Sequence, residues 1–304
     1  MMLSRTASHL YWMSRYLERA ENLARALDVS RELALLPQGR DLREDIAIPL
    51  ALTGTRAAFL ALHRDITPAG LWQTLGFSLD EPASIACCLK RARENAHAVR
   101  GSITADTWET LNTTWLELRA RLAAPDIDPG AFSDWVKDRS HLFRGIVFGT
   151  SLRNDAFNFL RLGTFVERAD NTARLLCAHA AVRERGADAY YPLLALLRSV
   201  SAIEAYQSCY RDSLTLRRVA ELLVLRPDLP RSLKSCLDEI SALLPAGGRQ
   251  VPQVRRRVAE LEAMLTWSDI DDVLAEGLPH YLAGFLDELH KLDTGIQHAY
   301  LEAL

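Results

Sequence analysis

The sequence predicts an all-α protein, a helical bundle without a β-sheet that is built from a tandem duplication of one helical unit with pseudo-twofold symmetry. Apolar residues recur at helical spacing in every long segment, and no segment shows the sustained alternation of a half-buried strand. The 304 residues, 49% hydrophobic and 25% charged, are typical of a globular chain that buries a large core. Two stretches of sequence also recur at nearly the same offset, which indicates the duplication.

Helix-breaking residues divide the chain into about eleven or twelve predicted helices with short connections. Thr67 and Asp128 each precede a proline, the arrangement of an N-cap followed by a residue that lacks an N–H. Each copy is expected to contain a long helix with a Glu-Arg sequence, a helix around 41–63 or 189–210, and a short helix before an Asp-x-Pro cap. The predicted breaks are Pro37-Gln38-Gly39, Thr67-Pro68, Asp80-Glu81-Pro82, Gly101, Asp128-Pro129-Gly130, Gly149, Gly186, Arg226-Pro227-Asp228 and Pro245-Ala246-Gly247-Gly248.

The internal repeat is the most informative feature. Residues 16–27 align without gaps on residues 165–176, with seven identities in twelve positions at an offset of 149. A second match at an offset of 148 aligns Asp80, Pro82, Ser84, Cys88 and Leu89 with Asp228, Pro230, Ser232, Cys236 and Leu237. We therefore expect one compact domain of two helical repeats, 1–148 and 149–304. Residues beyond about 245 do not align with the first half, so the second repeat is expected to have divergent C-terminal helices.

A band of polar side chains follows the first repeated helix opposite its apolar stripe. At 100° per residue, Tyr11, Arg15, Glu18, Arg19, Asn22 and Arg25 fall on one side, and the second copy keeps Glu167, Arg168, Asn171 and Arg174. On a solvated face, Glu could have changed to Gln, or Arg to Lys, after the duplication. The two copies instead keep the same residues. We therefore expect the band to be at least partly buried, with Glu18 and Glu167 each holding an arginine fork across the contact between the repeated helices.

The same band is compatible with two functions besides a structural network. Arg19 and Arg168 are candidates for binding a carboxylate of a peptide, because a guanidinium group offers bidentate geometry. Glu18 or Glu167 could instead be a general acid or base whose pKa burial raises. The sequence alone leaves these alternatives open, although a structural network is favoured.

Several other functions lack a signature in the sequence. There is no GxSxG sequence, glycine-rich phosphate loop or dinucleotide fingerprint, so no catalytic residue is assigned and no cofactor is expected. Basic and acidic residues are balanced, 36 against 39, which gives no indication of a nucleic-acid surface. No apolar run is long enough for a membrane span, and the N-terminus does not read as a secretory signal, so a cytoplasmic protein is expected. The five cysteines follow no CxxC spacing and are expected to be reduced, mostly buried thiols.

A metal site is the weakest of the alternatives. Glu94 and His97 have the Glu-x-x-His spacing of carboxylate di-iron bundles, and Glu18 and Glu167 could supply further ligands. No second Glu-x-x-His sequence occurs, and the nearest approximation is Asp287-Glu288-Leu289-His290 near the C-terminus. We therefore assign no metal ligand.

The chain resembles the alpha-E family, an all-helical bacterial domain with a Glu-Arg motif. Thr164 departs from this resemblance, because a basic residue matching Arg15 is expected there. The motifs that carry the resemblance cover nearly the whole chain: Ser4 to Ala7, Leu10 to Trp12, Arg15 to Asn22, Pro82 to Leu89, Arg91 to Ala96, Ser140 to Gly145, Phe159 to Asn171, Leu197 to Tyr206 and Arg217 to Glu221.

The resemblance implies a role rather than a reaction. Alpha-E proteins are similar to accessory components of bacterial systems that also contain an ATP-grasp ligase and transglutaminase-like proteins, with peptide synthesis or peptide modification as the common theme. The leading hypothesis is a non-catalytic interaction protein whose partner is such a ligase, a transglutaminase-like protein or a peptide. An enzyme of peptide or amide chemistry with a buried Glu-Arg site is the alternative, and a carboxylate-bundle metal protein is the second.

Overall fold

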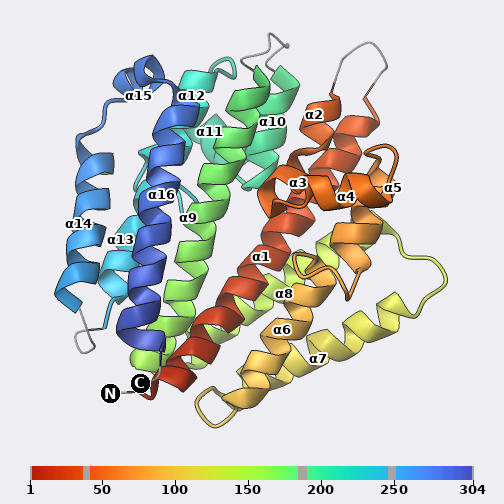
Figure 1. Ribbon diagram of the computed structural model, residues 1–304, viewed down its shortest axis with the longest axis vertical. Coiled ribbons are helices and arrows are strands. Elements are labelled where there is room, and N and C mark those ends of the chain that lie inside the picture. Colours follow the sequence, from red (N-terminus) through yellow and green to blue (C-terminus); the bar gives the residue numbers. More distant parts are fainter. Residues whose placement is uncertain (1, 37–41, 184–189, 246–250, 303–304) are drawn as a thin grey trace.

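A computed structural model describes residues 2–36, 42–183, 190–245 and 251–302, and within these ranges the chain forms only helices, turns and loops (Figure 1). Sixteen α-helices and two π-helical segments occur in this part of the chain. They are α1 (Ser4–Ala34), α2 (Arg43–Ile46), α3 (Ile48–Thr53), α4 (Arg56–Leu62), α5 (Pro68–Leu71), η1 (Trp72–Phe77), α6 (Ile85–Ala98), α7 (Ala105–Leu122), α8 (Pro129–Thr150), α9 (Asp155–Arg183), α10 (Tyr190–Ser199), α11 (Ile203–Cys209), α12 (Leu216–Val224), α13 (Leu233–Leu243), α14 (Val251–Trp267), α15 (Ile270–Glu276), α16 (Leu278–Ile296) and η2 (Gln297–Leu301).

The two longest helices, α1 and α9, lie against each other at the centre of the molecule (Figure 1). Their backbones are in close contact at Gly163, where an added Cβ atom would lie 2.2 Å from the carbonyl oxygen of Tyr11. Only glycine lets the two backbones come this near. This contact fixes how the polar bands of α1 and α9 face each other.

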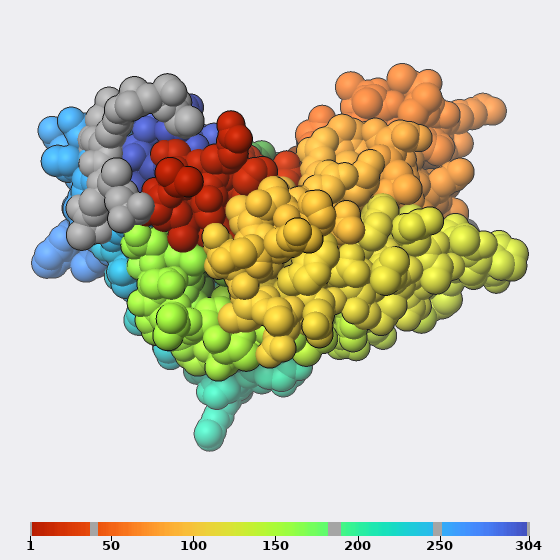
Figure 2. All heavy atoms as spheres, turned by 90° about the horizontal axis from the view of Figure 1, so that it is seen from below, coloured from red at the N-terminus to blue at the C-terminus, as the bar shows by residue number. Residues whose placement is uncertain are grey.

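The remaining helices form two groups on either side of this pair. Helices α6 and α8 pack against α1, with α7 against both of them, whereas α13 and α16 pack against α9, with α14 against both of these (Figure 1). Seen from below, the N-terminal part of α1 lies between the orange-yellow group and the blue group (Figure 2). Each central helix is therefore covered on several sides.

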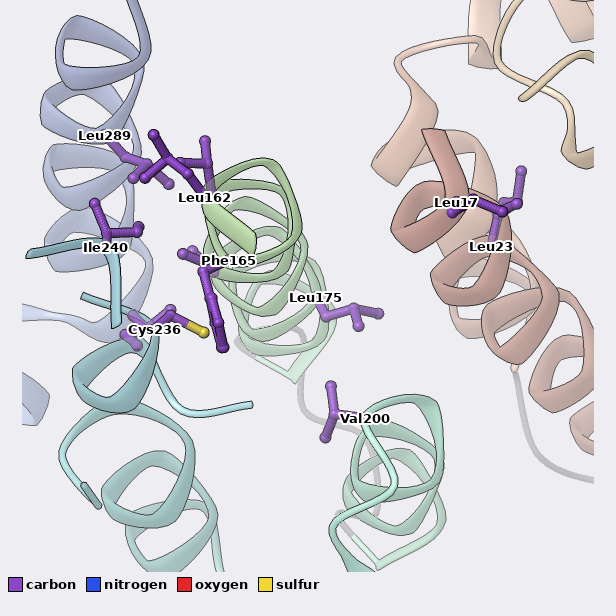
Figure 3. Packing of buried hydrophobic residues seen from close by; sticks show 14 of the residues in the cluster. Leu17, Leu23, Leu162, Phe165, Leu175, Val200, Cys236, Ile240 and Leu289 are labelled. Carbon is purple, nitrogen blue, oxygen red and sulfur yellow. The ribbon is translucent and has the colours of Figure 1, made fainter. Parts of the chain in front are cut away.

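One large apolar cluster runs through both groups. Around α9, Leu162 faces Leu289 of α16, and Phe165 faces Cys236 and Ile240 of α13 (Figure 3). Leu162, Cys236 and Ile240 are fully buried. Burying such side chains supplies the main driving force for the fold.

The caps expected at Thr67 and Asp128 are confirmed, whereas the expected Asp-x-Pro caps are wrong, because Ser84 and Ser232 cap α6 and α13. Thr67 accepts a hydrogen bond from Gly70 N at the start of α5, and Asp128 accepts one from Ala131 N at the start of α8. Gly101 lies between α6 and α7, and α8 ends one residue after Gly149. The breaks at Pro37-Gln38-Gly39, Gly186 and Ala246-Gly247-Gly248 lie outside the described residues.

The predicted number of helices was too low, and the helix expected over 41–63 is wrong. That region contains α2, α3 and α4, and a left-handed Gly54 (φ 68°) separates the last two. The corresponding region 189–210 contains α10 and α11, separated near a left-handed Ser201 (φ 52°). Apolar spacing continues across these turns, so periodicity alone did not reveal the breaks. Among the described helices, none is both long and apolar enough to cross a membrane.

Candidate functional site

Two reciprocal glutamate–arginine pairs join α1 to α9. Arg168 of α9 donates from Nε and Nη2 to the two carboxylate oxygens of Glu18, at 2.9 and 3.0 Å. Arg19 of α1 donates from Nε and Nη2 to those of Glu167, at 2.6 and 2.9 Å. The expected arginine forks across the helix contact are therefore present, and the two pairs occupy equivalent positions in the repeat.

The pair around Glu18 is extended by two further arginines and a second glutamate. Arg144 of α8 binds Glu18 Oε2 at 3.0 Å and Glu21 Oε2 at 2.5 Å. Arg231, two residues before α13, binds Glu18 Oε1 at 3.1 Å and Glu21 Oε1 at 2.7 Å. Its Nη1 also donates to Asn22 Oδ1 at 2.7 Å. Arginines of α8, α9 and the segment before α13 thus donate to every oxygen of the two carboxylates.

The pair around Glu167 is extended differently. Arg15 donates from Nε to Glu167 Oε2 at 2.8 Å and from Nη1 to Asp293 of α16 at 2.6 Å. Tyr11 donates its hydroxyl to the same aspartate at 2.5 Å. Thr164, the residue at the place of Arg15 in the second copy, donates its hydroxyl to Leu160 O within α9. A second matching arginine is therefore absent, as the sequence departure indicates.

Each band ends at an arginine beside an acid and a histidine. Arg25 binds Glu21 at 2.9 Å and lies 3.3 Å from His141 Nε2. On α9, Arg174 binds Asp170 at 2.7 Å and lies 3.0 Å from His290 Nε2. In both contacts, the arginine and the histidine are 116 residues apart in the sequence.

Most of the network is buried, and its charges support one another. Glu18 is 1% exposed and Glu21 is fully buried. Burial opposes ionisation of Glu18, but the charges of Arg168, Arg231 and Arg144 outweigh it and hold the pKa of Glu18 below its usual value. The pKa of Glu21 is held well below its usual value, because His141, Arg231 and Arg144 overcome the effect of burial. Both glutamates are therefore carboxylates at neutral pH.

The predicted site residues divide into three groups. Arg15, Glu18, Arg19, Glu167 and Arg168 come together between α1 and α9 as expected. Arg25 and Arg174 do not bind Glu18 or Glu167 and instead bind the acid four residues earlier on their own helix. The asparagines differ: Asn22 accepts from Arg231, whereas Asn171 makes no side-chain hydrogen bond within the described chain.

The sequence interpretation missed half of the network. The missed residues belong to two kinds: acids already present in the repeat, and partners supplied by distant helices. Glu21 and Asp170 occupy equivalent positions of the repeated sequence, and the acidic residue at both positions is a signal that could have identified them. For the partners on distant helices, no local sequence pattern indicates that they contact the band. They are Ser140, His141 and Arg144 on α8, Arg231 before α13, and His290 and Asp293 on α16.

Other candidate groups from the sequence lie in ordinary packing positions. Burial raises the pKa of Cys88 and of Cys236 to about 12, so neither thiol is activated. His97 packs against the Trp108 ring, with centroids 5.6 Å apart. Among the described residues, no group of three or more His, Cys, Asp or Glu side chains is placed to hold a metal ion. Trp267, the last residue of α14, is 86% exposed.

Two cavities are lined in part by residues of the network. The first, about 340 Å³, lies between α8, α9 and α13. Its lining combines phenylalanines with three arginines, Arg144, Arg161 and Arg168. The second, about 230 Å³, is lined by polar residues of α9 together with Arg19, Thr53 and Ala83.

Comparisons place the whole chain in a helical group without an assigned reaction. The model of a family described as a predicted alpha-helical domain with a conserved ER motif matches residues 2–301. Uncharacterised proteins of Mycobacterium bovis and of two Mycobacterium tuberculosis strains are each 27% identical over 312 residues, which cover 94% of this chain. The chain spans 35% of the length of these relatives. No solved structure matches it.

Proposed function

The chain belongs to the Alpha-E family, and from this premise we propose that it is a non-catalytic helical binding protein, an accessory component of a bacterial peptide-synthesis or peptide-modification system. The proposed partner is an ATP-grasp-type ligase, a transglutaminase-like protein or a peptide handled by them, as the resemblance of the motifs implies. The proposal includes a cytoplasmic location and requires no cofactor.

The observation that carries this proposal is the saturation of the motif glutamates. Glu18 accepts from Arg168, Arg231 and Arg144, and its pKa is lowered, since their charges outweigh the effect of burial. A general base that works near neutral pH needs the opposite shift and a lone pair that can reach a substrate. The Glu-Arg pairs are therefore suited to hold α1 against α9, which favours a rigid binding scaffold over an enzyme.

The first cavity is the proposed docking surface for the partner. Arg144 and Arg161 are about one quarter exposed, at 26% and 24% of their side chains, and Phe148 beside them is 59% exposed. Arg161 is bound by Glu239 through Nη2, which leaves its other donors for a ligand. An acidic segment with a neighbouring apolar side chain would complement these groups.

Co-expression with an ATP-grasp-type partner tests the docking. We expect the two chains to co-elute in gel filtration, and we expect Phe148→Ser to abolish co-elution because the mutation removes an aromatic anchor from the surface. Trp267→Ser is the matched control, since it removes an exposed aromatic side chain that does not line the cavity. Failure of the unmodified chain to co-elute with such a partner or to change its activity would contradict the proposal, as would equal binding by both variants.

Replacement of Glu18 separates the scaffold from the enzyme. Glu18→Gln leaves Arg168 without its carboxylate and leaves Glu21 alone to compensate Arg231 and Arg144, so we expect a loss of about 3–5 kcal/mol in the free energy of unfolding. Glu260→Gln, which breaks an exposed pair with Arg256, should cost less than about 1 kcal/mol. Urea unfolding measures both values. A Glu18→Gln protein of unchanged stability and partner binding that loses a turnover would favour the enzyme instead.

A further inference from the structure

Arg231 fills a polar site in the first half of the network. Its side chain is only 9% exposed and bridges three side chains of α1: Glu18, Glu21 and Asn22. Nη1 lies 3.1 Å from Glu18 and 2.7 Å from Asn22, and Nη2 lies 2.7 Å from Glu21. These two carboxylates and one amide oxygen thus form a receptor for one guanidinium group.

The same receptor recurs on α9 without its guanidinium group. The residues 149 positions after those three are Glu167, Asp170 and Asn171, and all of them line the second cavity. The residue 148 positions before Arg231 is Ala83, which lines the cavity as well. A methyl group therefore stands where the first half has a guanidinium group, and about 230 Å³ of space lies beside the three polar side chains.

Two polar side chains of this cavity, Glu167 and Asn171, each lack a partner that their counterparts have. Glu18 Oε1 accepts from both Arg168 and Arg231, whereas in the described chain Glu167 Oε1 accepts from Arg19 alone. Asn22 Oδ1 accepts from Arg231, whereas the side chain of Asn171, only 9% exposed, makes no hydrogen bond among the described residues. A buried polar side chain without a partner is costly and indicates a missing group.

The charges favour a cation as the missing group. In the first half, Glu18 and Glu21 are bound by four arginines: Arg25, Arg144, Arg168 and Arg231. In the second half, three carboxylates bind three arginines: Arg15, Arg19 and Arg174 pair with Glu167, Asp170 and Asp293. The second half therefore has one more negative charge and one fewer positive charge than the first.

We propose that the cavity between Ala83 and α9 binds the guanidinium group of an arginine side chain or arginine-like ligand, in the position that Arg231 occupies in the first half. The volume is below the roughly 300 Å³ of sites for whole drug-sized molecules, so it fits one side chain rather than a larger ligand. Arg19 and Arg174 in its lining are about one-third exposed, which gives a ligand access from solvent. This site specifies a ligand for the binding function proposed above, and its test needs no partner protein.

Three amino-acid amides whose two backbone ends are uncharged test which side-chain group the cavity binds. The full chain is titrated with Nα-acetyl-arginine methylamide and with the lysine and citrulline analogues, and binding is followed by calorimetry and by the shift in melting temperature. We expect the arginine amide to bind, the lysine amide to bind more weakly, and the citrulline amide not to bind, because citrulline has nearly the same shape without the charge. Absence of arginine binding, or equal binding of citrulline, overturns the proposal.

Two variants tie the binding to this cavity. Ala83→Arg supplies the missing guanidinium group from within the chain, so it should abolish binding of the arginine amide and raise the melting temperature. Asp170→Asn should weaken binding about tenfold or more, the loss typical of a hydrogen bond to a charged group. Asp271→Asn is the matched control, because Asp271 binds Arg217 on the exposed surface and should leave the affinity unchanged.

The outcomes remain decisive if Ala83→Arg does not fold, since Asp170→Asn then carries the test. Undiminished binding to either folded variant places the ligand elsewhere and overturns the proposal. Binding of acetate that Asp170→Asn strengthens would also overturn it, because Arg19 and Arg174 would then form an anion site. Co-elution with a partner protein is measured separately, so loss of the partner function and loss of this site give different results.

Discussion

Individual side chains of the network differ in how their charge depends on pH. Burial raises the pKa of Asp170, but the hydrogen bonds from His290 and Arg174 outweigh burial and lower it to about 2. The pKa of His290 is raised, first by its hydrogen bond to Asp170. A carboxylate with a lowered pKa stabilises the fold above its unfolded pKa, and a histidine with a raised pKa stabilises it below its unfolded pKa.

Asp170 should therefore contribute stability that is lost in acid. Because its folded pKa is about 2 and its ordinary value is 3.8, this contribution should disappear as the pH falls from about 4 to about 2. Asp170→Asn should flatten the dependence of the free energy of unfolding on pH in this window, and Asp126→Asn on the exposed surface is the control. Urea unfolding at a series of pH values measures the slopes, and equal slopes for the two variants would contradict the assignment.

At the scale of elements, the crossing of α1 and α9 determines the geometry of the network. Gly163 permits the contact with the Tyr11 carbonyl, and Glu18 and Glu167 lie within two turns of it along their helices. The two reciprocal forks then join the same pair of helices. Close backbone packing and charge pairing therefore depend on each other.

Gly163→Ala should push the two helices apart. A methyl group 2.2 Å from a backbone oxygen cannot be accommodated by a side-chain movement, so we expect a loss of about 1–3 kcal/mol in the free energy of unfolding. Gly145→Ala on α8 is the matched control, because no atom lies within 4 Å of the added methyl group. That variant should gain roughly 0.5–1 kcal/mol from helix propensity. A similar change in both variants, measured by urea unfolding, would contradict the close contact.

For the whole molecule, we propose that the chain arose by duplication of one helical unit. Several local geometries recur at offsets of 147 to 149 residues, and this recurrence supports the proposal. Gly54 and Ser201 both have left-handed backbones, and Ser84 and Ser232 both cap the helix that follows them. His141 and His290 both contact the last arginine of a band, although sequence comparison did not align the C-terminal part with the first half. The proposed boundary at 148/149 falls just before the end of α8 at Thr150.

The two halves should not fold separately. Glu18 in the first half is 1% exposed and depends on Arg168 and Arg231 in the second. Residues 1–152 and 153–304 expressed alone should lack cooperative unfolding in circular dichroism, since each leaves buried charges unpaired. Mixing the two chains should restore one folded complex in gel filtration. Cooperative unfolding of either half by itself would contradict this prediction.

The sequence by itself determined the helical class, the caps at Thr67 and Asp128 and the burial of the Glu-Arg band, because these features follow from local spacing and from identical residues in two copies. Only the tertiary structure decided which guanidinium groups meet which carboxylates. Arg144 and Arg231 reach Glu18 across 126 and 213 residues of chain, and no local pattern encodes such contacts. The difference between Ala83 and Arg231 is visible in the sequence, but its consequence, one filled and one open site, arises only when α9 brings Asn171 and two acids beside it.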